Sequence, residues 1–285
     1  MGRYRKMLIA VDGSDSSKNA FRQACVVARG EDSWITVLTA IPIYEDQFEV
    51  LSTRETIVRT LREEGEKIIS EIRKIAEKED VFIKTRIEEG SPFQTIIDVS
   101  EENNYDLIVV GRRGLRRLEK ALVGSVTARV IGHSRRNVLV IPRNATLGWK
   151  HILLATDGSK HSAAAAEKAI NVAKSYDSKL KVVSVVDVTE EFYAQAPDAV
   201  EEMVYKAKDF VDKIRRKAEA EGVNVQTFVK EGEAYRVIND LAREQKTDVI
   251  LMGSHGRTGV KRLLMGSVTE KVIGYAPCPV LVVIG

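Results

Sequence analysis

The sequence predicts an α/β protein with two tandem doubly wound domains, each a five-stranded parallel sheet with helices on both faces. Short apolar runs alternate with longer amphipathic segments along all 285 residues, which is typical of successive β-α-β units. The same order of segments occurs twice. The pattern Gly-x-x-Gly, nine residues, Gly-Ser is found at 111–125 and again, 142 residues later, at 253–267. This repetition indicates two copies of one domain.

The composition agrees with a globular protein and argues against several functional classes. The chain is 44% hydrophobic and 30% charged, and no apolar run approaches the roughly 18 residues that cross a bilayer. We therefore expect a cytoplasmic protein without membrane contact. The net charge of +3 is too small to predict nucleic-acid binding. Cys25 and Cys278 occupy unrelated positions in the two halves, which predicts reduced, buried thiols rather than a disulfide.

The first domain is expected to span residues 1–144. Asp12-Gly13-Ser14 follows the first apolar run and offers a turn and an N-cap for the first helix. A long second helix is predicted where Ile57, Leu61, Ile68 and further apolar residues recur at helical spacing. A third helix is expected after Gly90-Ser91-Pro92, and a fourth from 125 to 133. The predicted strands cover 6–11, 34–41, 81–87, 105–110 and 138–141.

The second domain is expected to span residues 148–285, after a short linker at 143–148. Asp157-Gly158-Ser159 again follows the first strand, and an alanine-rich helix comes next. A long helix is predicted from the apolar spacing between Val200 and Ala218, and shorter helices are predicted after Gly232 and from Ser267 onward. The predicted strands cover 152–156, 180–186, 223–229, 249–252 and 280–284.

Ligands of such sheets bind outside the carboxyl ends of the strands, where the strand order reverses. The loops after the first and fourth strands of each half carry the aspartate and the glycines. We expect the glycines to adopt positive φ and to let the backbone approach a ligand without an intervening Cβ. Gly124-Ser125 and Gly266-Ser267 then present a helix N-terminus, which favours an anion such as phosphate.

The loops also supply side-chain charge. The basic residues and histidine between the motif glycines are Arg112, Arg113, Arg116, Arg117 and Lys120 in the first half and His255, Arg257, Lys261 and Arg262 in the second. The competing interpretation is that the glycines only turn the chain and the basic residues form a solvated rim. For Asp12 and Asp157 the alternatives are a ribose contact, a divalent cation held beside phosphates, or simple Asp-Gly turn chemistry.

Other reactive motifs are absent from the sequence. It contains no G-x-x-x-x-G-K-[ST], no G-x-G-x-x-G and no H-E-x-x-H. The four histidines, 133, 151, 161 and 255, show no metal-ligand spacing. His161 and His255 lie near the predicted site, so a phosphate contact stays open for them. No acid and base pair indicates a catalytic site.

These motifs resemble the universal stress protein family in its tandem two-domain form. The resemblance covers nearly the whole chain, and it is strongest from Gly253 to Val283, in G-S-H-G-R-T-G-V-K-R-L-L-M-G-S-V-T-E-K-V and A-P-C-P-V-L-V-V. The first half departs from it in two places. Arg112-Arg113 replaces Ser254-His255, and Ser-Arg-Arg-Asn at 134–137 replaces Ala-Pro-Cys-Pro at 276–279.

The resemblance implies an adenine nucleotide alpha hydrolase-like fold that binds ATP, ADP or AMP, with Mg²⁺ or Mn²⁺ as a candidate companion. It also implies that the last strand of each half, 138–141 and 280–283, joins the two domains as a pseudo-dimer. The residues implied at the first site are Asp12, Ala40, Val110, Gly111, Gly114, Gly124, Ser125 and Val126. Those implied at the second are Asp157, Val185, Met252, Gly253, Gly256, Gly266, Ser267 and Val268.

Three functions stay open on the sequence. The first is a nucleotide-binding stress or signalling protein with one site per domain, of unequal affinity, whose bound nucleotide alters a surface read by an unidentified protein partner. The second is a slow metal-dependent ATP hydrolase or phosphotransferase. The third is an assembly role with vestigial sites, and a further homodimer is compatible with any of them.

Overall fold

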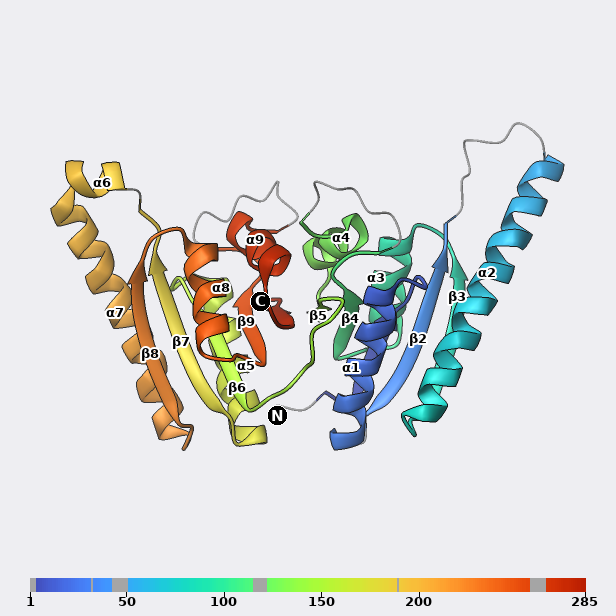
Figure 1. Ribbon diagram of the computed structural model, residues 1–285, viewed down its shortest axis with the longest axis horizontal. Helices are drawn as coiled ribbons and strands as arrows, with labels where there is room; N and C mark the ends of the chain where they lie inside the picture. Colours follow the sequence, from blue (N-terminus) through green and yellow to red (C-terminus); the bar gives the residue numbers. More distant parts are fainter. Residues whose placement is uncertain (1–3, 32, 43–50, 115–121, 189, 257–264) are drawn as a thin grey trace. The chain divides into compact units, whose positions relative to one another are not determined.

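The computed structural model describes residues 4–31, 33–42, 51–114, 122–188, 190–256 and 265–285. The described chain divides into two compact units, one from residue 4 to 144 and one from 145 to 285. The first unit runs from blue to green and the second from yellow-green to red in Figure 1. None of the helices in the described segments is both long and apolar enough to cross a membrane.

The first unit is a parallel sheet with the strand order β3-β2-β1-β4-β5. Helices α1 and α2 contact each other over one part of this sheet, and α3 and α4 contact each other over another. The strands are β1 (Lys6–Ala10), β2 (Trp34–Ile41), β3 (Ile83–Glu89), β4 (Leu107–Gly111) and β5 (Asn137–Ile141). The helices are α1 (Asp15–Glu31), α2 (Leu51–Lys78), α3 (Pro92–Glu102) and α4 (Ser125–His133).

The second unit repeats this arrangement with the order β10-β9-β6-β7-β8, all parallel. A short helix, α6, precedes α7 and was not predicted from the sequence. The strands are β6 (His151–Ala155), β7 (Lys179–Val186), β8 (Val225–Glu231), β9 (Val249–Gly253) and β10 (Val280–Val283). The helices are α5 (Lys160–Tyr176), α6 (Glu190–Gln195), α7 (Pro197–Ala220), α8 (Ala234–Glu244) and α9 (Ser267–Tyr275).

Burial explains the strand sequences. The central strands are apolar runs because both of their faces are covered, as in β4, Leu-Ile-Val-Val-Gly, and β9, Val-Ile-Leu-Met-Gly. The edge strand β3 reads Ile-Lys-Thr-Arg-Ile-Glu-Glu and is only partly buried, which keeps an exposed sheet edge charged. The predicted fold class, two domains with five parallel strands and helices on both faces, is confirmed.

Helix starts follow the expected capping chemistry. Ser14 precedes α1, and its Oγ accepts a hydrogen bond from Ser17 N at 3.2 Å. Ser159 caps α5 in the same way, accepting from Ser162 N at 3.2 Å. These serines fix where each first helix begins, directly after the Asp-Gly turn, and so fix the position of the turn itself.

Candidate functional site

The strand order reverses between β1 and β4 in the first unit. β1 leads through α1 to β2 on one side, whereas β4 pairs with β1 on the other side and leads to β5. The matching point in the second unit lies between β6 and β9. Because all these strands are parallel, the loops after β1 and β4, and after β6 and β9, leave the sheet at the same edge.

The Asp-Gly-Ser turn forms one wall of the first site. Asp12 Oδ1 accepts hydrogen bonds from Ser14 N at 3.1 Å and from Ser14 Oγ at 2.6 Å. Gly13 lies between them with φ of +81°, a conformation that strongly favours glycine. A Cβ placed on Gly114 would overlap Asp12 Oδ2. The loop after β1 therefore touches the loop after β4.

The motif glycines serve close packing rather than unusual dihedral angles. A Cβ on Gly111 would lie 2.7 Å from Ser16 Oγ and 2.9 Å from Ser17 N, so this glycine lets the end of β4 pack on the first turn of α1. The prediction of positive φ is wrong for the six motif glycines, since the positive-φ glycines of the described chain include Gly13 and Gly158 but none of those six. Their shared role is the absence of a Cβ.

The start of α4 is built by Gly124. Its N–H donates to Arg112 O at 2.9 Å, and Ala128 N bonds back to Gly124 O at 2.9 Å. The N-cap glycine has no side chain that could cap the helix, and the first-turn amide groups of a helix have no intrahelical acceptor. Thr127 Oγ1 donates to Gly111 O at 2.9 Å and ties the helix to the end of β4. These bonds hold the helix N-terminus against the end of β4 and the loop that follows it.

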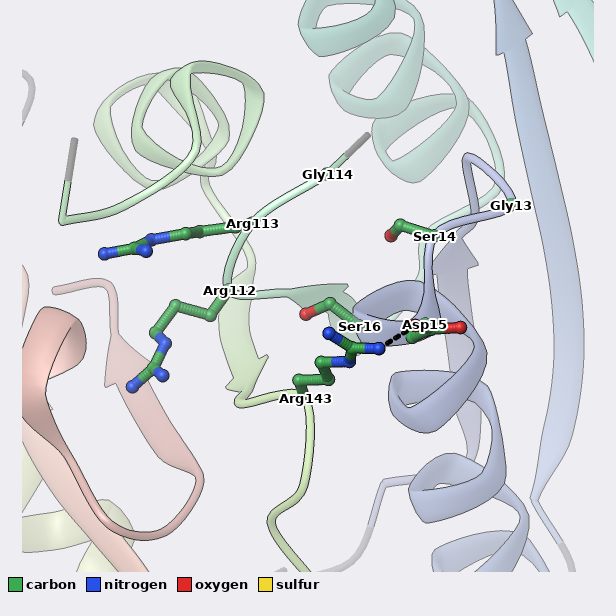
Figure 2. Close-up of a pocket in the computed structure, with 8 residues that line it drawn as sticks. All are labelled: Gly13, Ser14, Asp15, Ser16, Arg112, Arg113, Gly114 and Arg143. Atoms are coloured by element: carbon green, nitrogen blue, oxygen red, sulfur yellow. Dashed lines mark hydrogen bonds and ion pairs between the residues drawn. The ribbon is translucent and has the colours of Figure 1, made fainter. Parts of the chain in front are cut away.

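A cavity of about 360 Å³ lies at the start of α1, lined by residues 13–16, 112–114 and 143. Figure 2 shows it between the first turn of α1 and the loop that follows β4. Its basic residues are Arg112, Arg113 and Arg143, and Arg143 forms an ion pair with Asp15. Burial, together with the adjacent charge of Arg113, lowers the pKa of Arg112. An anion in the cavity would offset both effects.

The second unit repeats the same frame. Asp157 Oδ1 accepts from Ser159 N at 3.0 Å, and a Cβ on Gly256 would lie 2.8 Å from Asp157 Oδ2. Gly266 N donates to the loop, to Ser254 O, at 2.9 Å, and no side chain caps α9. As in the first unit, a threonine hydroxyl in the helix, here that of residue 269, donates to Gly253 O, at 3.1 Å.

The side chains next to the Asp-Gly-Ser turn differ between the two sites. In the second unit the ring of Phe210 lies so close to Gly158 that a Cβ there would overlap the ring. In the first unit a Cβ on Gly13 would meet the side chain of Ile68 at 3.1 Å. The rings of His161 and His255 lie 5.6 Å apart, centroid to centroid, at an interplanar angle of 47°. The first unit has Ser16 and Arg113 at the matching positions.

The structure brings most of the residues implied by the resemblance to one edge of each sheet. Gly111, Gly114, Gly124 and Asp12 are joined by the contacts given above. Ala40 and Val185 are half-buried one strand away, near the ends of β2 and β7. Val110, Met252 and Gly253 are buried, Ser125, Val126 and Ser267 are exposed, and Val268 is half-buried. Arg116, Arg117, Lys120, Arg257, Lys261 and Arg262 fall outside the described residues.

Sequence reasoning missed several residues at these sites. Thr127 and Thr269 stand two residues after each Gly-Ser, so the repeat itself could have revealed them. Arg143 was assigned to the linker, although it lines the first cavity. In the described part of the chain no three His, Cys, Asp or Glu side chains group as a metal site, and the Mg²⁺ or Mn²⁺ of the sequence analysis stays a prediction.

Both halves of the chain are similar to one family. The model of the universal stress protein family matches residues 3–142 and 148–283. A universal stress protein of Methanocaldococcus jannaschii is 39% identical over 148 residues, which are 50% of this chain and 86% of the relative. The crystal structure of a universal stress protein from Archaeoglobus fulgidus has a similar fold, with a TM-score of 0.73 at 24% identity over 99% of this chain and 97% of its own. An Arabidopsis thaliana family protein with AMP bound aligns at a TM-score of 0.38 and 22% identity over 50% of this chain and 93% of its own.

Proposed function

The chain belongs to the universal stress protein family, and from this premise we propose that each of its two domains binds one adenine nucleotide. The protein then acts as a nucleotide-dependent stress-response or signalling protein. In each domain the phosphates lie at the start of α4 or α9, and the nucleoside lies toward the end of β2 or β7. ATP, ADP and AMP are the candidate ligands.

The observation that carries this proposal is an uncapped helix start at the point where the strand order reverses, found twice. The amide groups of the first turn of α4 and α9 have no intrahelical acceptor, and the glycine at each N-cap lets the motif loop pack closely against the helix start. In the first domain the lining of the cavity at the start of α1 includes three arginines, the side chain best suited to phosphate.

The aspartates fit a ribose contact better than a purely local turn. Asp12 and Asp157 hold a neighbouring serine amide through Oδ1, while Oδ2 is the atom that lies against the glycine of the opposite loop. A carboxylate between the two loops is placed to accept a hydrogen bond from a sugar hydroxyl. We propose this role for both residues.

Isothermal titration of nucleotide-free protein with ATP, ADP and AMP tests the proposal. We expect two equivalents of nucleotide per chain. Replacing Gly124 by Val should remove one equivalent and replacing Gly266 by Val the other, because the Cβ would meet atoms of the motif loop at 3.4 Å and 3.3 Å, respectively, and the larger side chain would push that loop away from the helix start. Gly30→Val is the matched control: no heavy atom lies within 4 Å of a Cβ there, so both equivalents should remain. Absence of binding to the wild-type protein, or unchanged stoichiometry in both site variants, would refute the proposal.

The same samples separate binding from hydrolysis. Time-resolved product analysis of ATP, with and without magnesium, follows whether nucleotide bound at the two sites is consumed. A binding protein returns ATP intact under both conditions, and we expect that result. Magnesium-dependent release of ADP would instead favour the slow hydrolase that the sequence left open.

A further inference from the structure

The internal repeat gives every residue of one site a counterpart in the other, and the two sites differ most on the phosphate side. The first site carries Ser16 and Arg113 where the second carries His161 and His255. The chain contains four histidines, and two of them meet at this one place. The motif loops at 115–121 and 257–264 contain no histidine in either half.

Both histidines are held in position by their surroundings. A Cβ on Gly253 would lie 2.9 Å from the carbonyl carbon of His161 and 3.0 Å from its Cβ, so the end of β9 packs directly on this residue. His255 Nδ1 lies 3.2 Å from Ser254 Oγ, and that serine is buried. Packing and hydrogen bonding therefore restrain both residues, unlike surface side chains without contacts.

The pair stands at the helix start where the phosphate is proposed to bind. His161 belongs to the first turn of α5, and the Cα of His255 would lie 3.3 Å from a Cβ on Gly266, the N-cap of α9. His161 Nδ1 is buried and has no hydrogen-bond partner in the described part of the chain. A buried ring nitrogen without a partner is unfavourable, which indicates that the environment of this ring is completed by something else.

We propose that His161 and His255 contact the phosphate of the nucleotide in the second domain and make binding there dependent on proton uptake, whereas binding in the first domain is not. This inference rests on the proposed nucleotide function and adds a specificity difference between its two sites. At the first site the side chains that contact the phosphate are permanently charged arginines. At the second site they are two histidines, the residue type whose charge changes most readily near neutral pH.

Other charged groups belong to the elements that surround the pair. Asp157 lies in the loop after β6, Lys160 begins α5, and the ends of β9 and β10 contribute Gly253, Ser254 and Gly285. Arg257, Lys261 and Arg262 of the motif loop fall outside the described residues. Ordinary carboxylates, ammonium groups and guanidinium groups do not titrate between about pH 5.5 and pH 8.5, whereas imidazole does.

The direction of the effect follows from charge. A phosphate beside an imidazole favours its protonated form, so the histidine pKa is higher in the complex than in the unliganded protein, and affinity increases as pH falls. Because two charges 5.6 Å apart repel each other, we expect binding to favour the charged form of one histidine rather than both, and a pKa rise of about one unit gives a net uptake of at most about half a proton per nucleotide.

The experiment measures AMP binding by titration calorimetry at pH 5.5, 7.0 and 8.5, in two buffers that differ in ionisation enthalpy. Gly124→Val reports the second site alone and Gly266→Val the first site alone. The phosphate of AMP itself titrates in this range, so the same titrations on a variant without the two histidines separate that contribution from theirs. Relative to the first site, the second should bind about tenfold more tightly at pH 5.5 than at pH 8.5 if binding raises one histidine pKa by about one unit.

Variants that exchange the residues of the two domains provide the control. His161→Ser combined with His255→Arg gives the second site the side chains of the first, and its pH profile should become that of the first site while AMP still binds. NMR titration of the four histidines with and without AMP checks the wild-type protein directly, and one of the two at the second site should show a pKa raised by about one unit in the complex. Equal pH dependence at both sites with unchanged histidine titration overturns this inference alone. No AMP binding at any pH overturns the proposed function as well.

Discussion

Replacing Gly114 by Ala should disable the first site more than Gly256→Ala disables the second. In the wild-type structure the loop after β4 passes so close to the loop after β1 that a Cβ on Gly114 would overlap Asp12 Oδ2, whereas a Cβ on Gly256 would lie 2.8 Å from Asp157 Oδ2. The added methyl group in the first unit must therefore displace the carboxylate. In the second unit a small rotation of the side chain is enough.

The magnitude follows from the bonds that Asp12 would lose. Its Oδ1 accepts two hydrogen bonds from Ser14, at 3.1 and 2.6 Å, and hydrogen bonds to a charged group contribute about 1.5–3 kcal/mol each when fully formed. The site is only partly buried and water can replace part of the loss, so we expect Gly114→Ala to cost about 1.5–3 kcal/mol in total. For Gly256→Ala, where one bond to Ser159 is at stake, we expect about 1 kcal/mol or less.

Two assays check this ranking. Thermal denaturation gives the stability difference, and a cost of about 2 kcal/mol should lower the Tm by roughly 4–8 °C in a unit of this size. Titration with ATP in the Gly266→Val background gives the affinity of the first site, which we expect to fall at least about tenfold, since the carboxylate and the helix start are disturbed together. Equal effects of the two alanine variants, or a fully active Gly114→Ala protein, would refute this account of the loop contact.

Three further predictions concern stability. Burial raises the pKa of Cys25 and of Cys278 to about 12, so neither thiol should react with iodoacetamide at pH 8 until the chain is unfolded. The thiols lose their protons at lower pH in the unfolded chain than in the folded one. The free energy of unfolding should therefore fall above about pH 9, by roughly 1.4 kcal/mol per thiol and pH unit. Asn239 is 1% exposed and lacks side-chain hydrogen bonds within the described residues, and Asn239→Ile, the residue at the matching position of the first unit, should raise the free energy of unfolding by about 1–3 kcal/mol. Gly30→Ala should stabilise helix α1 by about 0.5–1 kcal/mol. Gly111→Ala should destabilise the protein by about 1–3 kcal/mol, because the added Cβ would meet the main chain of that helix at 2.8–2.9 Å. Denaturant titration measures both changes, and a more stable Gly111→Ala than Gly30→Ala protein would contradict this prediction.

The fold could be predicted because local patterns and topology rules agree. Apolar runs such as β4 and β9 are buried on both faces, and a parallel sheet with right-handed crossovers leaves few ways to arrange five such strands. Boundaries were less accurate at the edges. β3 was predicted at 81–87 but runs from Ile83 to Glu89, because the backbone of Glu88 and Glu89 still pairs with β2. The alternation of residue types therefore gave both ends of this edge strand wrongly by two residues.

The site could be predicted only as far as topology determines it. The rule that loops meet where strand order reverses correctly brought the loops after β1 and β4 together. It could not assign the glycines, because the contact that requires Gly111 is made by Ser16, far away in the sequence. Arg143 was missed for the same reason, since only the folded chain places it beside Asp15.

Comparing the two units distinguishes residues that the fold requires from residues that can differ with the ligand. Features found in both units at matching positions make the same contacts twice: the aspartate with the serine amide, the N-cap glycine with the carbonyl of its loop, and the threonine hydroxyl with the end of the strand. These contacts hold the loops in place. Two of the positions that differ lie where an anion is proposed to bind. They are Ser16 and Arg113 in the first unit and His161 and His255 in the second. A duplicated domain can therefore exchange permanent charge for titratable charge at one site without disturbing the frame that both sites share.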